Sequence, residues 1–298
     1  MSRVALLSVL CLFVIGCSAK SAQVETTNLS EPPPASEEEA PATESEPAPV
    51  ETSKVGIQLA DVPFSPFDPA KPEGIQVYPL VGNPGAGAFN AIVKLPPGHT
   101  SPLHSHSASY SGVSLTEGHV HSLTAEVNEP LPAGSTWHQP AGEPHIDACR
   151  SEEPCLFLVF FDGAVDMVAA EAPAAEPKAT INPADQMKWA EAKAGVMMSV
   201  IHGNPKEGPF HAVFDFPAGM TTNVHTHSAS FSGGLLSGTH HRGPSPDGLR
   251  TLTAGAVWHE ASNSPHMEKC GEEQRCVFAG AMNGAMDTSN VELNTTKE

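Results

Sequence analysis

Six histidines recur in a spacing that suits metal coordination. His104 and His106 lie two positions apart on an expected strand, so both rings project from one face and can reach the same ion. The expected third ligand is His145, which follows a turn at 140–144, and the arrangement returns 121 residues later. Three neutral imidazoles leave coordination positions open on a first-row divalent metal for water, dioxygen or a chelating molecule. The predicted metal ligands are His104, His106 and His145 in one set, and His225, His227 and His266 in the other.

Further residues at the same offset could complete each site. Asp147 and Glu268 lie two positions beyond the third histidine, so strand geometry aims them to the same side. We treat them as candidate catalytic residues that act as a fourth ligand, a hydrogen-bond acceptor or a general base, with a solvated acidic residue as the alternative. Eight side chains are pocket candidates, although core or surface positions would explain the four histidines among them equally well: Tyr110, Ser111, His119, His138, Phe231, Ser232, His240 and His259.

The chain after residue 54 contains one unit twice. The segment 82–84 reappears as 203–205, and 104–109 reappears as 225–230, without a gap. This register indicates a tandem duplication of domains of about 120 residues. Histidines without a partner in the register are expected at the surface: His99, His121, His202, His211 and His241. The predicted parts are a first domain at 55–168, a linker at 169–179, a second domain at 180–288 and a tail at 289–298.

The elements that must position these residues are strands. Phe89, Ala91, Val93 and Leu95 occupy every second position, with polar Asn90 and Lys94 between them, and this is the period of a half-buried strand. The continuous apolar run 156–161 indicates a strand that is buried on both faces. The 25 glycines and 29 prolines favour many turns over long helices. We therefore predict an all-β chain in which each domain is a small barrel or sandwich.

Four cysteines form one Cys-x5-Cys pair in each domain, Cys149 with Cys155 and Cys270 with Cys276. Five intervening residues suit a disulfide across a hairpin in an oxidising compartment, with a stabilisation of about 2 kcal/mol in the loop-entropy model. The alternative is a metal-binding thiolate pair, which would need a second Cys or His pair at finger-like spacing. We predict two disulfides.

The first 54 residues indicate export. Arg3 precedes an apolar run at 4–16, whose 13 residues are too few to span a bilayer but suit the core of a signal peptide. The end of this run, 14–17, resembles the lipobox of bacterial lipoproteins. The resemblance implies a signal peptide at 1–16 and a lipid on Cys17, and Ser18 then favours the outer membrane, facing the periplasm. A secretory peptide that is cut elsewhere is the alternative.

The segment 17–54 is predicted to be a disordered acidic tether. Between residues 18 and 54 there is no aromatic side chain, while eight glutamates and six prolines occur. Such a composition cannot bury enough apolar surface to offset the entropy of ordering. The formal charge of −19 for the whole chain would repel phosphate backbones, so nucleic acid is not an expected partner. The membrane is an expected partner only through the lipid, and barrel edge strands leave a homodimer open.

The histidine pattern also resembles a known superfamily. Gly98-x5-His104-x-His106, ending at Gly118, and Pro140-x-Gly142-x2-His145 are similar to the two-part signature of the cupins. The resemblance implies two tandem double-stranded β-helix barrels. In the second copy, 261–263 replaces the Pro-x-Gly turn. The segment 134–145 further resembles a bacterial two-domain (bicupin) lipoprotein family of unassigned function.

The usual cupin glutamate has no counterpart, since Tyr110 and Ser111 stand where it would fall. The remaining three-histidine set is similar to that of cupin thiol dioxygenases and diketone-cleaving dioxygenases, which hold ferrous iron. We expect up to one divalent metal per domain and a small-molecule partner. Fe²⁺ and Zn²⁺ are the preferred candidates for the metal, and Mn²⁺ and Ni²⁺ are the alternatives. Three functions remain open: an oxygenase acting on a small chelating substrate, a metal-dependent binding or sensing module, and purely structural metal sites.

Overall fold

The structure, a computed structural model, describes residues 52–126 and 129–292. Nearly every element in these residues is a β-strand, which confirms the predicted all-β class. The described helical segments are three 3₁₀ turns, and none of them is long and apolar enough to cross a membrane: η1 (Leu59–Asp61), η2 (Ala184–Gln186) and η3 (Pro246–Gly248).

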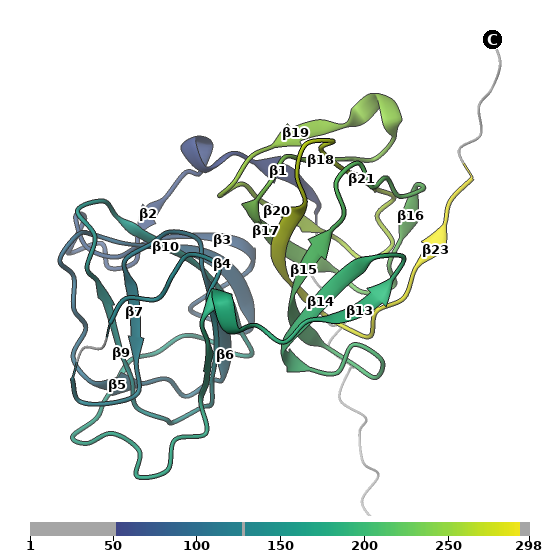
Figure 1. Ribbon diagram of the computed structural model, residues 1–298. Helices are drawn as coiled ribbons and strands as arrows, with labels where there is room; N and C mark the ends of the chain where they lie inside the picture. Colours follow the sequence, from purple (N-terminus) through teal and green to yellow (C-terminus); the bar gives the residue numbers. More distant parts are fainter. Residues whose placement is uncertain (1–51, 127–128, 293–298) are drawn as a thin grey trace, which may run out of the picture. The chain divides into compact units, whose positions relative to one another are not determined.

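The first barrel consists of one seven-stranded sheet and two small sheets (Figure 1). The large sheet has the order β12-β8-β6-β10-β4-β3-β2, and the small ones are β7-β9 and β11-β5. These strands are β2 (Ser65–Pro66), β3 (Gln76–Gly82), β4 (Phe89–Leu95), β5 (His104–Ser105), β6 (Tyr110–Ser114), β7 (His119–Ser122), β8 (Thr136–Gln139), β9 (Ile146–Cys149), β10 (Cys155–Phe161), β11 (Val168–Ala169) and β12 (Thr180–Asn182).

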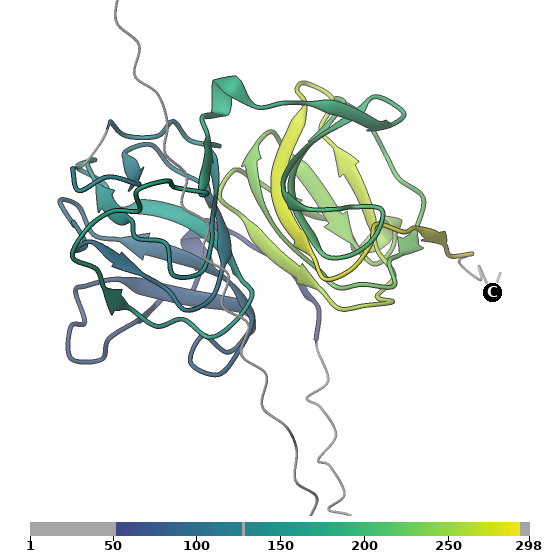
Figure 2. The same ribbon diagram turned by 90° about the horizontal axis from the view of Figure 1, so that it is seen from below.

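The second barrel repeats this plan, and Figure 2 shows the strands of each barrel curving around its interior. Its large sheet has the order β1-β20-β17-β22-β15-β14-β13, beside the sheets β19-β18-β21 and β16-β23. These strands are β1 (Lys54–Ile57), β13 (Ala190–Lys193), β14 (Val196–Gly203), β15 (Phe210–Phe216), β16 (His225–Thr226), β17 (Phe231–Ser237), β18 (His240–Gly243), β19 (Arg250–Leu252), β20 (Val257–Glu260), β21 (Met267–Cys270), β22 (Cys276–Met282) and β23 (Ser289–Asn290).

Strand β10 is buried along its whole length, as its apolar run predicts. It pairs with β4 on one edge and with β6 on the other. Phe157 and Val159 pack into the interior of the first barrel, whereas Leu158 and Phe160 join a core that also contains residues of the second barrel. Both faces of β10 therefore meet apolar surface, which explains the absence of polar residues at every second position.

The two barrels exchange strands. β1 pairs with β20 of the second barrel, with Lys54 opposite His259, and β12 pairs with β8 of the first barrel, with Ile181 opposite Trp137. The predicted boundaries instead place residues 55–57 of β1 in the first domain and all of β12 in the second domain. The predicted tail also contributes a strand, because β23 pairs with β16. A strand of two to four residues cannot specify its own partner, and tertiary packing decides the pairing.

Each barrel contains one of the predicted disulfides. Cys149–Cys155 joins β9 to β10, and Cys270–Cys276 joins β21 to β22, with Cα atoms 5.6 Å and 5.7 Å apart. The predictions for the leader concern residues outside the described ranges: the signal peptide at 1–16, the lipid on Cys17 and all but the last residues of the tether at 17–54.

Candidate metal centres

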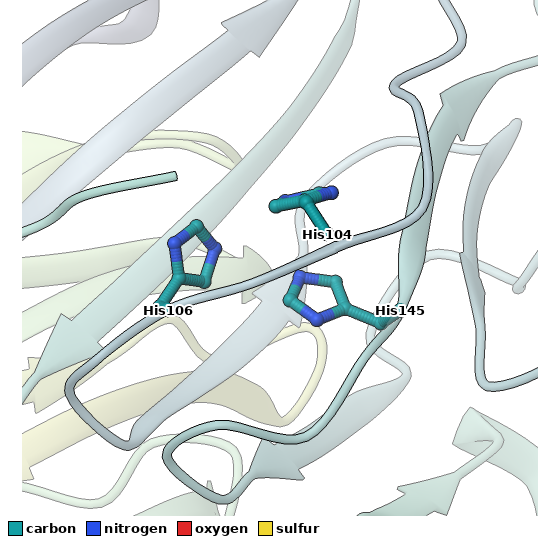
Figure 3. A group of neighbouring side chains, drawn as sticks. All are labelled: His104, His106 and His145. Atoms are coloured by element: carbon teal, nitrogen blue, oxygen red, sulfur yellow. The ribbon is translucent and has the colours of Figure 1, made fainter. Parts of the chain in front are cut away.

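The first histidine triad lies where β5 meets the start of β9. His104 is in β5, His106 follows it, and His145 directly precedes β9 (Figure 3). Reciprocal backbone hydrogen bonds, 3.0 Å and 2.8 Å long, join His104 to His145. All three side chains are buried, and one ring nitrogen from each lies within 4.8 Å of the other two. The three rings can therefore converge on one ion.

Backbone carbonyls fix which ring nitrogen is available. The Nδ1 atom of each ring in the first triad donates to a carbonyl oxygen, that of Pro102, Asp166 or Glu143 respectively. A ring that donates from Nδ1 keeps its Nε2 lone pair free for a metal. Three Nε2 donors form a set that a first-row divalent cation accepts, so the residues present fit the metal that the sequence predicts.

Burial favours the neutral form of His104, His106, His225 and His227. Desolvation lowers the pKa of His106 to about 4 and that of His225 in the second triad to about 4, against partial compensation from their backbone hydrogen bonds. Burial also lowers the pKa values of His104 and His227. Neutral rings at pH 7 can bind a metal without first releasing protons.

The second triad repeats the first in detail. The ligand atoms of His225, His227 and His266 also lie within 4.8 Å of one another, and each Nδ1 donates to a carbonyl at the 121-residue offset, that of Asn223, Asp287 or Ser264. The turn before the third histidine has the same backbone conformation in both barrels, although its residues differ. Gly142 has φ +73° and Asn263 has φ +57°, and each N–H donates at 2.8 Å to the carbonyl of the second histidine. Asparagine tolerates this left-handed conformation better than most residues.

Polar side chains surround the first triad. Tyr110 Oη lies 3.0 Å from His145 Nε2, and Asp147 Oδ2 lies 3.4 Å from the same nitrogen. Asp147 Oδ1 accepts from His121 Nδ1 at 2.9 Å and contacts His119 Nε2 at 3.3 Å. Burial alone would raise the pKa of Asp147, yet the surrounding histidines, His121 foremost, hold it well below its usual range. The first triad therefore has a phenol and a carboxylate beside it.

The second triad has an ion-pair network in the same place. Arg242 stands at the position of His121, and its buried guanidinium contacts Glu268 and lies 3.0 Å from Glu260. Glu260 Oε2 is also 3.0 Å from His266 Nδ1. Burial opposes the charge on Glu260, but Arg242 and His266 lower its pKa to about 2. Glu268, the counterpart of Asp147, therefore forms an ion pair with Arg242. Phe231, the counterpart of Tyr110, has no hydroxyl group.

A cavity of about 110 Å³ adjoins the first triad. His104, His106, Tyr110 and Asp147 line one part of it, and its other walls are mainly apolar side chains of β3, β4 and β10. Its volume is several times the roughly 10–15 Å³ that one water molecule requires. The cavity therefore has room for a small organic molecule in contact with the triad.

Four pocket candidates lie at the contact between the barrels instead: Ser111, His138, Ser232 and His259. The Ser111 hydroxyl is 3.2 Å from His138 Nδ1 and 2.8 Å from His211 Nδ1 of the other barrel. The Ser232 hydroxyl is likewise 2.9 Å from His259 Nδ1. Of the other four candidates, Tyr110 lines the cavity and Phe231 belongs to the core of the second barrel. His119 and His240 are buried against Phe157 and Phe278 and do not line a barrel mouth.

The surface prediction is wrong for several unpaired histidines. His121 and His211 are buried, and His99 is half-buried and lines the cavity, whereas His202 is exposed as expected. A lone histidine in a strand gives no sign of which face it occupies, so the sequence offered no signal here. The carbonyl acceptors Asp166 and Asp287 were also missed, although their separation of 121 residues could have revealed them.

Solved structures share this fold at low sequence identity. A candidate dioxygenase from Nostoc punctiforme matches with a TM-score of 0.57 and 11% identity, over 80% of this chain and 92% of that one. Salicylate 1,2-dioxygenase from Pseudoaminobacter salicylatoxidans, in adducts with gentisate, gives 0.56 and 13%, over 78% and 83%. Oxalate decarboxylase from Bacillus subtilis, studied for its Mn(II) centres, gives 0.52 and 13%, over 81% and 80%. These neighbours confirm the predicted cupin fold.

A comparison with curated proteins finds no match. A family model covers residues 79–284, a span that includes both triads and both disulfides. This match extends over more than half of the sequence. The chain therefore belongs to the family described as a domain of unknown function, DUF4437.

Proposed function

We propose that the first barrel is the catalytic half of a metal-dependent oxygenase that acts on a small oxygen-chelating substrate. The observation that supports this proposal is the cavity beside the first triad, which has a phenol and a carboxylate at its polar end. An Fe²⁺ ion held by the triad would supply Lewis acidity and redox chemistry toward dioxygen. The dioxygenases among the structural neighbours agree with this choice but contribute only their fold.

The residues beside the triad have distinct tasks in this proposal. The Tyr110 hydroxyl can donate its proton to a substrate oxygen, because it lines the cavity at the end where the triad lies. Asp147 can accept a hydrogen bond at Oδ2 from a hydroxyl group of the substrate. His121 and His119 hold the other carboxylate oxygen, so they fix the orientation of Asp147.

The second barrel is assigned a structural metal in the same proposal. Arg242 engages both Glu260 and Glu268, so the counterpart of Asp147 in the second barrel is held in an ion pair. An ion there would stabilise the folded barrel by binding to the folded state alone.

The proposed location is the periplasmic face of the outer membrane, through a lipid on Cys17. A Cys17→Ala variant should lose incorporation of labelled palmitate. Unchanged labelling would contradict the anchor.

The decisive experiment measures metal and turnover on the same sample. The exported protein is purified without oxygen, its metal per chain is determined, and oxygen uptake is screened against small diketones, thiols and phenols. We expect two ions per chain and uptake with at least one class. Tyr110→Phe should lower the rate by about 100-fold, within the usual range for one acid-base group, whereas the reverse exchange Phe231→Tyr should not change it. Two ions and no uptake would favour the binding or sensing module.

A further inference from the structure

The cavity of the first barrel separates polar from apolar surface. His104, His106 and Tyr110 form its polar end, where a metal-bound group would lie. Val93 and Leu95 of β4 and Phe157 of β10 belong to the remaining wall, which is predominantly hydrocarbon. A bound molecule would therefore meet hydrogen-bonding groups at its head and carbon along its body.

The charged residues in the wall are both acidic. Among the described residues that line the cavity, Asp147 and Asp166 carry charge, and there is no lysine or arginine. Asp166 is already engaged, since its carboxylate accepts from Ser107. The pKa of His99, the remaining histidine in the wall, is lowered by burial, so its ring is neutral at pH 7. An anionic group away from the metal would find no cation to pair with.

The rim continues the apolar wall to the surface. Phe67 is 46% exposed and Met167 is 53% exposed, and both line the cavity. Large exposed apolar side chains at a cavity entrance favour entry of a molecule with an apolar body. The counterparts of Val93 and Leu95 in the second barrel are Phe214 and Phe216, whose rings lie 5.2 Å and 5.0 Å from the Phe278 ring. The volume that a substrate would occupy in the first barrel is thus partly taken by these rings in the second.

We infer that the ligand of the first barrel is a small molecule with a single oxygen-chelating head and an uncharged apolar body. This inference rests on the proposed function, because the chelating head requires a metal at the first triad. The cavity wall selects for the body, and Val93, Leu95 and Met167 are its specificity-determining residues.

Two probes with the same chelating head test the inference. 4-Methylcatechol and 3,4-dihydroxybenzoate share the same chelating head and differ by a methyl group against a carboxylate at the far end. Each is titrated calorimetrically into the zinc-loaded protein, and into zinc-loaded His225→Ala so that only the first triad holds metal. We expect 4-methylcatechol to bind at least about tenfold more tightly, because the carboxylate would be buried without a partner.

A charge added at the rim should reduce this preference. Met167→Arg, at an exposed position that should tolerate it, is expected to improve the binding of 3,4-dihydroxybenzoate by roughly threefold or more. Met286→Arg is the matched control, since Met286 is 37% exposed and stands in the second barrel at the position of the cavity residue Val165. That variant should bind both probes as the parent protein does.

The outcomes separate the two claims. Equal affinities, tighter binding of the acid, or no binding of either probe to a zinc-filled first triad would overturn the inference and leave the proposed metal site standing. A first triad without zinc would overturn the proposed function as well. An improvement of acid binding by Met286→Arg equal to that by Met167→Arg would show a nonspecific effect of charge and would also count against the inference.

Discussion

The two triads are alike in how they position a metal and unlike in what surrounds it. Both use three histidines whose Nδ1 atoms donate to carbonyls at equivalent positions, and both end in the same turn. The neighbours then differ. Tyr110 is replaced by Phe231, and His121 is replaced by Arg242. The repeat therefore preserves the ligand geometry and varies the groups that a substrate would touch.

This difference separates a metal site from a reactive site. Three fixed Nε2 donors are sufficient to hold an ion, and both barrels have them. A reaction also needs space and a group that can move a proton. In the proposed function the first barrel supplies these with the cavity and Tyr110, whereas the second barrel has Phe231 in place of Tyr110 and its carboxylates Glu260 and Glu268 are engaged by Arg242. The comparison is testable because each residue has a matched partner 121 positions away.

The largest expected effect comes from removing a ligand. His104→Ala should weaken metal binding at the first triad by at least about 100-fold, beyond the range seen for residues that merely support a ligand. Metal per chain, measured after dialysis, should fall from two ions to one. His225→Ala is the reciprocal control and should empty only the second triad. Retention of both ions in both variants would contradict the triads as metal sites.

Removing the buried cation of the second barrel should lower the stability of the folded chain. Arg242→Met leaves Glu260 and Glu268 without their guanidinium partner, and an unpaired buried charge typically costs about 3–5 kcal/mol. Urea unfolding at pH 7.5 measures the loss. His121→Met makes the matched change in the first barrel, where Asp147 keeps His119, so we expect about 1–2 kcal/mol there. Equal losses would mean that the two networks have the same structural role.

The sequence predicts what depends on short spacing and on the repeat. Two histidines two apart on a strand share a face, and an offset of 121 residues marks their counterparts, so both triads and both disulfides follow from local geometry. The fold class follows from alternation and turns. These signals are local, and the periodicity of a strand is sufficient to generate them.

The sequence does not predict what tertiary packing decides. Nothing in the four residues of β1 indicates that they pair with β20 of the second barrel. Arginine is rarely buried, so Arg242 gives no sign that it lies between two carboxylates. The same holds for His211, whose burial depends on the contact between the barrels.

The contact between the barrels should make stability sensitive to acid. His211 is buried against His202 and His138, and burial foremost lowers its pKa to about 3. The unfolded chain takes up a proton near the ordinary value of about 6.5, so it binds more protons than the folded chain at pH 3–6.5. The contribution of neutral His211 to the free energy of unfolding is fully present above pH 6.5. It decreases as the pH falls below this value, by up to about 1.4 kcal/mol per pH unit.

His211→Asn should reduce this loss. The first barrel has Asn90 at the same position, where its amide donates to Ser232 at 2.9 Å, so the variant copies a contact that the chain already uses. Between pH 7.5 and 4.5 we expect the variant to lose up to about 2.7 kcal/mol less than the parent in urea unfolding. His241→Asn, outside the contact, should behave as the parent does. Parallel pH profiles for all three proteins would refute the assignment.

The smallest expected effect concerns the turn that both triads share. Asn263 has φ +57° and Gly142 has φ +73°, and a side chain with a Cβ is strained there by about 1–2 kcal/mol. No atom lies within 4 Å of a Cβ added at Gly142, so Gly142→Ala measures the backbone cost alone. Asn263→Ala should cost about 1 kcal/mol and Asn263→Gly should cost less, since glycine adopts this conformation freely. If Asn263→Gly is as unstable as Asn263→Ala, the side chain of Asn263, and not its backbone conformation, stabilises the second turn. The two turns would then share a shape but be stabilised by different interactions.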